Sequence, residues 1–396
     1  MKLKQTPGDF AVEEITDARP DDFGPFAFYR LRKTGWTTPD ALQIVCRKFD
    51  VAWARLSYGG LKDRHAETIQ YLTIDHGPQR PMDHDRLDLT YLGQRREHYS
   101  SRNILANRFT ITLRSLAAED VDPILQRCAE VDRMGVPNYF DDQRFGSVTA
   151  DGRFIGRELV RGNFEEALKL ALVEPYEFDR SETKIEKQIL RDHWNDWPTC
   201  KAKLPKGHAR SLITYLCDHP TKFKGAIERL RPELQGMYLS AYQSELWNRI
   251  LSRWIVANTA ENGRGTIDQD RGPMPIPLQL TPEVFEQWKQ LSIPLPSPKV
   301  QLEATTLLGQ LFDQVLTEEE LTLKKLKVQG LDRPFFSRGE REACLWPRGL
   351  QAEPGNDELN QGRRKMTLRF DLPRGAYATM VVKRLTNAED TTPVPE

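Results

Sequence analysis

Alternation of apolar and polar side chains predicts several strands. In Arg108–Arg114 (RFTITLR), three apolar residues alternate with polar ones, which is the period of a strand with one buried and one wet face. Residues 55–58 are a short strand candidate, and 68–74 (TIQYLTI) is rich in β-branched and aromatic side chains. Alternation returns at Met366–Phe370. We therefore expect an antiparallel sheet with one open face.

Apolar positions spaced by three and four residues predict helices. The first covers Pro39–Phe49, because Thr38 can cap it and Pro39 fits its first turn. The second covers Asp120–Met134, with Leu125 on its apolar stripe. From Phe164 onward the predicted helices cover residues 164–172, 181–194, 208–217, 221–230 and 240–256.

The order of these elements suggests how the chain is organised. Residues 257–300 are rich in Gly, Pro and Gln, which favours loops or short strands. After the strand near Met366–Phe370, a helix is predicted from Tyr377 to Leu385. This order predicts a β-rich domain that is split by a helical insertion, so that the first part and about the last 50 residues close into one sheet.

Composition narrows the class of protein. The 396 residues include 57 Lys+Arg and 57 Asp+Glu, and this zero net charge argues against a protein that coats polyanions, such as a histone. The N-terminal residues MKLKQTPGDF lack the apolar run of a signal peptide, and no stretch approaches 18 apolar residues, so we expect no membrane span. The five cysteines are scattered without a CxxC pair, which fits reduced thiols in the cytoplasm and no zinc.

One segment places several ionisable residues together. Residues 58–73 (YGGLKDRHAETIQYLT) carry a glycine pair followed by the charged run Lys62–His65. One interpretation is a solvated hairpin tip. The other is that the glycines bring the backbone close to a ligand and present Asp63 beside cations, which would keep its carboxylate ionised for nucleophilic or base chemistry.

A second segment combines amide, aromatic and cationic side chains. Residues 136–146 (VPNYFDDQRFG) contain Asn138, Phe140 and Arg144. A buried aromatic cluster explains this pattern equally well. The functional alternative is a site for a flipped base, because the amide can pair with a base edge while the ring stacks on its face.

Two further segments have both ordinary and functional explanations. In residues 4–14 (KQTPGDFAVEE), Lys4 is either a frayed terminal charge or part of a site. In residues 372–385 (LPRGAYATMVVKRL), Arg374 precedes a predicted helix, whose free N–H groups could hold a phosphate with it. An ordinary turn between strand and helix is the alternative.

Basic residues also cluster along the chain. Arg95–Arg114 has five arginines and one acid, Lys201–Leu234 has eight basic and three acidic residues, and Lys324–Arg348 has seven and three. In a neutral chain, such runs indicate a positive surface, which is the expected footprint of a nucleic-acid partner.

These four segments, in this order, resemble the motifs of the TruD family of pseudouridine synthases. GLKDRHAETIQ resembles the catalytic signature, VPNYFDDQRFG the second motif, KQTPGDFAVEE the N-terminal motif and LPRGAYATMVVKRL the C-terminal motif. RFIGRELVRGNFEEAL and YLSAYQSELWNRIL are similar to parts of the insert that characterises this family. The resemblance covers nearly the whole chain.

The resemblance implies an α+β fold with a mixed, mainly antiparallel sheet flanked by helices and a largely helical inserted TRUD domain. Its domains would be a catalytic domain of residues 1–153 and 344–396 and an insert of residues 154–343. It implies an isomerase that converts a D-stem uridine of tRNA, at position 13, to pseudouridine, as a cytoplasmic monomer without metal or organic cofactor. Asp63 matches the catalytic aspartate, and the matching RNA-binding positions are Lys4, Lys62, Asn138, Phe140, Arg144 and Arg374.

Three alternatives remain open at this point. The same family could act on other RNAs, which length and motifs do not distinguish. A catalytically silent RNA-binding protein would keep the basic surface but has no need of Asp63. A carboxylate glycosidase for small nucleosides would need a second acid nearby, for which Glu14 and Glu67 are weak candidates.

Overall fold

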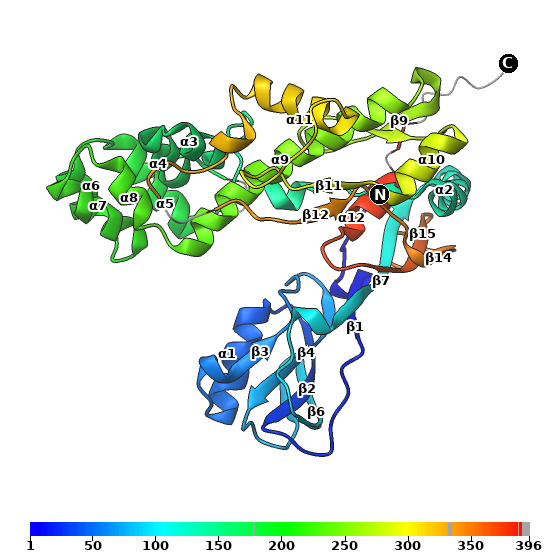
Figure 1. Cartoon of the computed structure of the whole chain (residues 1–396). Coiled ribbons are helices and arrows are strands. Elements are labelled where there is room, and N and C mark those ends of the chain that lie inside the picture. Colours follow the sequence, from blue (N-terminus) through cyan, green and yellow to red (C-terminus); the bar gives the residue numbers. More distant parts are fainter. Residues whose placement is uncertain (177–178, 332–334, 387, 390–396) are drawn as a thin grey trace. The chain divides into compact units, whose positions relative to one another are not determined.

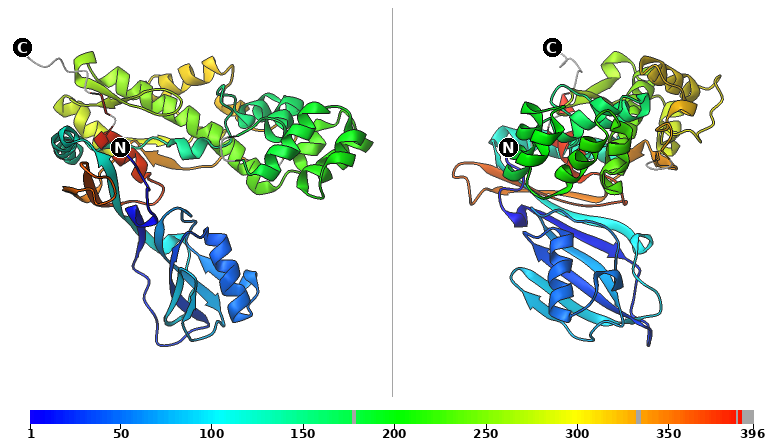
Figure 2. Two further views of the ribbon diagram at one scale, coloured as in Figure 1. Left: turned by 180° about the vertical axis from the view of Figure 1, so that it is seen from behind. Right: turned by 90° about the vertical axis from the view of Figure 1, so that its left-hand side faces the viewer.

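The computed structural model describes residues 1–176, 179–331, 335–386 and 388–389. The backbone forms two compact units (Figures 1 and 2). The first contains residues 1–136 and 345–386, and the second contains residues 137–344 with the strand Ala388–Glu389. The second unit begins before the predicted insert, and the domain boundaries at 153/154 and 343/344 stay a prediction.

A mixed sheet forms the centre of the first unit. Its strands run in the order β14-β15-β7-β1-β4-β2-β6-β5, with β3 paired to β4. The pair β1–β4 is parallel, and the other pairs are antiparallel. The strands are β1 Phe10–Thr16, β2 Phe26–Thr34, β3 Leu56–Tyr58, β4 Glu67–Asp75, β5 Met82–His84, β6 Leu87–Arg95, β7 Ile104–Leu116, β14 Arg348–Asn356 and β15 Arg364–Leu372. The predicted mainly antiparallel α+β fold is thereby confirmed.

Three helices of the described residues belong to this unit: α1 Thr38–Phe49, α2 Val121–Met134 and α12 Ala378–Thr386. Helix α1 begins one residue earlier than predicted, because its cap is Thr37 and not Thr38: the Thr37 side chain accepts a hydrogen bond from the Asp40 N–H. The helix lies against the sheet (Figure 1). The core between them includes Leu42 and Val45 of the helix and Leu31, Leu72 and Leu89 of the strands. This core supports β2 and β4, which flank the Asp63 loop.

Helix α2 differs in one detail from its prediction. Ile124, Val131 and Met134 are buried, whereas Leu125 is exposed. Helix α2 packs against both α12 and β14. The buried Arg384 of α12 forms an ion pair of 2.7 Å with Glu130 of α2.

The second unit is largely helical, as predicted for the insert. Its helices are α3 Ile155–Arg161, α4 Phe164–Leu172, α5 Ser181–Asp192, α6 Trp197–Lys203, α7 His208–Asp218, α8 Phe223–Glu228, α9 Pro232–Asn258, α10 Pro282–Gln290 and α11 Leu307–Glu318. Small sheets pair β9 Arg264–Ile267 with β10 Met274–Pro277 and β16 Ala388–Glu389, and β11 Ser292–Pro294 with β12 Glu340–Glu342. Strands β8 Val136–Pro137 and β13 Cys344–Leu345 form a further pair.

The long helix α9 runs through this unit beside α11 (Figure 1). It starts at Pro232, earlier than the predicted residue 240, because Pro232 fits a first helical turn. Helix α10 lies inside a segment that was expected to form loops or short strands. Its cap is Thr281, and its Trp288 is buried and stacked on Trp254 at 5.5 Å between ring centres.

Short 3-10 helices cover Pro7–Asp9, Trp53–Arg55, Ser101–Asn103, Ala118–Asp120, Asp142–Phe145, Glu261–Gly263 and Leu323–Lys325. Within the described ranges, no helix has both the length and the apolar character that a membrane crossing requires.

Candidate active site

Asp63 lies in the loop between β3 and β4. Its Oδ2 forms an ion pair with Lys4 Nζ, and its Oδ1 accepts a hydrogen bond of 3.0 Å from the His65 N–H. Partial burial alone would raise the pKa of the Asp63 carboxyl, but the hydrogen bonds from Lys4 and His65 outweigh it and lower the pKa. The carboxyl group is therefore ionised at neutral pH, while 37% of the side chain stays accessible to solvent.

Lys4 is held in place from two sides. Its backbone has a φ of 57°, which is unusual for a residue other than glycine, and its Nζ lies 4.3 Å from the centre of the Phe10 ring. The neighbouring Lys2 exchanges backbone hydrogen bonds of 2.7 and 2.9 Å with Arg114 of β7. The buried Arg114 guanidinium also binds the buried Asp9 carboxylate at 2.7 Å. The N-terminal segment is thus fixed to the sheet on both sides of Lys4.

Lys62 points the opposite way from its neighbour Asp63. Its Nζ forms an ion pair of 2.7 Å with Glu14 Oε1, and the Glu14 side chain is fully buried. The second Glu14 oxygen accepts hydrogen bonds of 3.1 Å from the Tyr71 N–H and the Tyr99 hydroxyl. Burial and the Glu14 charge raise the pKa of Tyr99, so its hydroxyl stays a donor. Lys62 therefore anchors the loop, and its predicted contact with RNA stays a prediction.

Lys33 of β2 was not among the residues chosen from the sequence. Its side chain is fully buried, and its Nζ donates to the carbonyl oxygens of Trp36 at 2.8 Å, Asp63 at 2.9 Å and Lys62 at 3.4 Å. Burial lowers the pKa of Lys33 to about 8, although the Asp63 charge partly opposes this. A signal was present in the sequence, since Lys33 continues the inward row of Ala27, Tyr29 and Leu31.

Two buried polar side chains complete the support of the loop. The Thr38 hydroxyl at the start of α1 donates a hydrogen bond of 2.9 Å to Gln70 Oε1 and accepts one of 2.9 Å from the Lys62 N–H. Gln70 Nε2 in turn donates to the Gly60 carbonyl at 3.3 Å. Gln70, which was not among the residues chosen from the sequence, thus holds the Asp63 loop through these contacts.

Arg374 lies in the first unit, just before α12. It is exposed, and its Nη1 donates to the Ser101 carbonyl at 2.6 Å. That bond fixes the side chain at the surface. Binding of a phosphate by Arg374 stays a prediction.

In the second unit, Asn138 is bonded to β12 on both sides of its amide. Its Nδ2 donates a hydrogen bond of 2.9 Å to the Glu342 carbonyl, and its Oδ1 accepts a hydrogen bond of 2.5 Å from Arg341 Nη2. The Asn138 N–H also donates to the Ala343 carbonyl at 2.8 Å. These contacts tie the second motif, residues 136–146, to β12.

Phe140 lies next to the same arginine. The Arg341 guanidinium carbon is 4.2 Å from the centre of the Phe140 ring, and the Trp247 ring meets it edge-on at 5.5 Å. Asn248 of α9 pairs with the Phe140 backbone through bonds of 2.9 and 2.8 Å. Arg144 is also close, with its guanidinium carbon 5.6 Å from the ring centre. Arg341 and Asn248, which come from distant segments, were not found from the sequence.

The predicted site residues thus fall into two groups. Asp63, Lys4 and Lys62 lie together at the loop between β3 and β4 in the first unit. Arg374 belongs to the same unit. Asn138, Phe140 and Arg144 of the second motif lie together in the second unit. Arg144 lies beside the Phe140 ring, and Arg341 contacts both that ring and Asn138.

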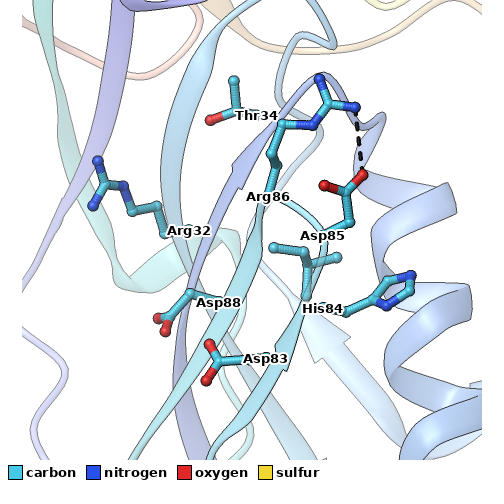
Figure 3. Close-up of a pocket in the computed structure, with 8 residues that line it drawn as sticks. Arg32, Thr34, Asp83, His84, Asp85, Arg86 and Asp88 are labelled. Carbon is cyan, nitrogen blue, oxygen red and sulfur yellow. Dashed lines mark hydrogen bonds and ion pairs between the residues drawn. The ribbon is translucent and has the colours of Figure 1, made fainter.

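A separate hollow of about 580 Å³ lies at the β5–β6 hairpin (Figure 3). Its lining has both charge signs: Arg86 pairs with Asp85 at 3.5 Å, and Arg32 pairs with Glu67 outside the hollow. The lining residues are Arg32, Thr34, Asp83, His84, Asp85, Arg86, Leu87 and Asp88. Among the described residues, no group of three or more His, Cys, Asp or Glu is placed to hold a metal ion.

Comparison with known proteins identifies the family. The model of the family tRNA pseudouridine synthase D (TruD) matches residues 1–385. A relative from Methanocaldococcus jannaschii that carries this family name is 31% identical, over 97% of this chain and 91% of its own. A tRNA pseudouridine synthase D from Leptospira interrogans is 29% identical, over 97% of this chain and 95% of its own.

A solved structure gives the same answer for the fold. A crystal structure from Methanosarcina mazei that is assigned to tRNA pseudouridine synthase D has a TM-score of 0.74 and 28% identity, and the match covers 98% of this chain and 94% of that one. The resemblance inferred from the four motifs is confirmed. The chain belongs to the TruD family of tRNA pseudouridine synthases.

Proposed function

We propose that this chain isomerises a D-stem uridine of tRNA, at position 13, to pseudouridine, with Asp63 as the catalytic carboxylate. The observation that carries the proposal is the state of that carboxylate. Lys4 and the His65 N–H keep Asp63 ionised and oriented, on a loop whose backbone is held by buried side chains. An ionised, partly accessible carboxylate on a rigid support is what nucleophilic or base catalysis requires.

The reaction breaks the N1–C1′ glycosidic bond and forms a C5–C1′ bond, and a proton leaves C5 while N1 gains one. Cleavage develops positive charge on the ribose and negative charge on the uracil. Asp63 can serve by attacking the sugar carbon, by attacking the ring, or by taking a proton from the sugar. All three routes need the ionised form, which the Lys4 contact favours.

The second motif is proposed to hold the uracil after it leaves the stem. Phe140 would stack on the base, and Arg144, beside the same ring, would contact the RNA. Because the amide of Asn138 is bonded at both ends within its own unit, its proposed role is to order this segment. Lys62, in the same way, would act by anchoring the Asp63 loop to Glu14.

The test uses tRNA transcripts and Asp63→Asn, which keeps the shape of the side chain and removes its charge. Pseudouridine is mapped by carbodiimide treatment and reverse transcription. We expect one modified uridine, in the D stem, with the wild-type protein and none with Asp63→Asn. The matched control is Asp85→Asn, an exposed aspartate on the β5–β6 hairpin, which should retain activity. Full activity of Asp63→Asn would refute the assigned role, and modification outside the D stem would refute the proposed target.

We also infer that the protein acts as a monomer in the cytoplasm, where its proposed substrate is found. The expectation of a monomer comes from the family resemblance. Light scattering of the purified protein at micromolar concentration should give the mass of one chain, 45.7 kDa. A mass of two chains would contradict this inference.

A further inference from the structure

The Asp63 loop carries an apolar side chain that is left in solvent. Leu61 is 68% exposed, which is more than any other leucine among the described residues. Single exposed apolar residues are common on protein surfaces and need no explanation by themselves. Leu61 differs in its position, since it lies two residues before the proposed catalytic carboxylate.

Leu61 and Asp63 are accessible to solvent, whereas the side chain of the residue between them is largely covered. The Lys62 side chain is only 11% exposed, and it reaches inward to the Glu14 carboxylate. The Asp63 side chain is 37% exposed, and Leu61 is more exposed still. This alternation places the leucine and the carboxylate on the outer side of the loop, while Lys62 anchors its inner side.

The backbone on both sides of Leu61 is fixed. The Gly60 carbonyl accepts from Gln70, and the Lys62 N–H donates to Thr38. The start of the loop is tightly packed, because a Cβ added to Gly59 would lie 2.5 Å from Ile104 Cδ1. Leu61 therefore cannot turn inward to bury its side chain without breaking these contacts, and it is held outward.

We propose that Leu61 enters the RNA stem as a wedge and fills the place that the target uridine leaves in the base stack. The proposal rests on the proposed function, in which Asp63 must reach a nucleotide that starts inside a stacked stem. Extruding that nucleotide exposes the faces of the two neighbouring bases. An aliphatic side chain can cover those faces, as leucine and similar residues do when they part base steps in other nucleic-acid complexes.

The first test compares Leu61→Ala with the wild type in single-turnover reactions on two substrates. One is the intact tRNA transcript, and the other lacks the strand that pairs with the target uridine. We expect a rate constant lower by roughly 10- to 100-fold on the intact stem, the loss expected for one apolar side chain, and a change of less than about threefold on the open substrate. Leu61→Met should restore most of the rate.

Leu359→Ala is the matched control. Leu359 is also exposed, at 47%, but it lies in the turn between β14 and β15. It should behave like the wild type on both substrates. Equal losses for Leu61→Ala on both substrates, or no loss on the intact stem, would overturn the proposal.

A second measurement does not depend on turnover. In the Asp63→Asn background, 2-aminopurine placed beside the target uridine should become brighter on binding, because its stacking partner is extruded. Adding Leu61→Ala should reduce this increase at least about threefold at saturating protein, and an unchanged increase would overturn the wedge. Failure of the proposed function has a different signature, namely activity of Asp63→Asn or no D-stem modification by the wild type.

Discussion

The charge of the Asp63 carboxyl depends on opposing effects at a single residue. Partial burial favours the neutral acid, whereas the Lys4 ammonium and the His65 N–H favour the anion. The contact with Lys4 exists because the N-terminal segment is fixed to β7 through Lys2 and Arg114, far from Asp63 in sequence. The Lys4 contact therefore extends the ionised form of Asp63, the proposed catalytic residue, to lower pH.

Lys4→Met should shift the acid limb of the pH–rate profile toward higher pH. The variant keeps the burial of Asp63 and loses the cation that offsets it, so the pKa of Asp63 rises. As pH falls, the ionised form is then lost sooner than in the wild type. Because the carboxylate also loses a partner that orients it, we expect the rate constant near neutral pH to fall about tenfold or more.

Single-turnover rate constants measured from about pH 3.5 to pH 8 check this shift, because the ordinary pKa of an aspartate is about 3.9. Lys2→Met is the control, since the exposed Lys2 ammonium binds Asn360 at 3.0 Å. Its acid limb should match the wild type. An unshifted limb in Lys4→Met would show that the ion pair does not control the ionisation of Asp63.

At the scale of elements, the Asp63 loop is held by parts of β1, β2, α1 and β4. Each contributes one side chain: Glu14, Lys33, Thr38 and Gln70 respectively. Glu14 and Lys33 are charged groups that are fully buried, and a buried ammonium such as that of Lys33 is costly unless it is well bonded. Its three carbonyl partners include those of Lys62 and Asp63, so its loss would loosen the loop itself.

The lowered pKa of Lys33 gives a pH-dependent stability with a definite sign. Its pKa is about 8 in the folded protein against an ordinary value of 10.5. Below about pH 8 the lysine is protonated in both states, and the full penalty of burying the charge applies. Between these two values the unfolded chain binds more protons, so the contribution of Lys33 to the free energy of unfolding improves as pH rises.

Lys33→Met removes this titration with little change in side-chain length. We expect the free energy of unfolding of the wild type, relative to the variant, to increase by about 2–3 kcal/mol from about pH 7.5 to pH 10.5. Denaturant unfolding at the two pH values measures the difference. The exposed Lys48→Met on α1 should show no such trend. A constant difference between wild type and Lys33→Met would contradict the lowered pKa.

The elements with strong local signals could be predicted from the sequence, and those that depend on distant contacts could not. Helix α1 and strand β15 follow from a Thr–Pro start and from clean alternation. Helix α10 was missed because the surrounding segment 257–300 is rich in Gly, Pro and Gln, although Thr281 and Pro282 signal the start of the helix. The burial of Trp288 against Trp254 of α9 stabilises it, and such a contact is not visible in the local sequence.

The same distinction holds for the site. The Asp63 segment was identified from its motif, and its partner Lys4 from the resemblance. Glu14 and Arg341 were not identified as support, because each acts on a segment that is distant in the chain: Glu14 on Lys62, and Arg341 on Asn138. A single sequence holds no information on which distant residues share a buried contact.

At the scale of the whole molecule, the two compact units differ in how the chain builds them. In the second unit the entry and exit of the chain meet, since the Asn138 N–H binds the Ala343 carbonyl and Arg341 binds Asn138. This unit also has a core of its own around buried residues such as Trp247 and Trp288. In the first unit, by contrast, β15 lies between β7 and β14, so the sheet joins strands from both ends of the sequence.

This difference predicts that the two units behave differently when they are separated. A fragment of residues 137–344 should fold, with helical circular dichroism and cooperative thermal unfolding, because its ends already meet and its core lies within the fragment. A fragment of residues 1–136 should not unfold cooperatively. Without β15, the apolar face of β7, including Phe109 and Ile111, loses the strand that pairs with it, and α2 loses its contact with α12.

Cooperative unfolding of residues 1–136, or its absence in residues 137–344, would show that the cores are coupled differently. Adding residues 345–386 in trans should restore cooperativity to the first fragment, because those residues supply the missing strand and helix.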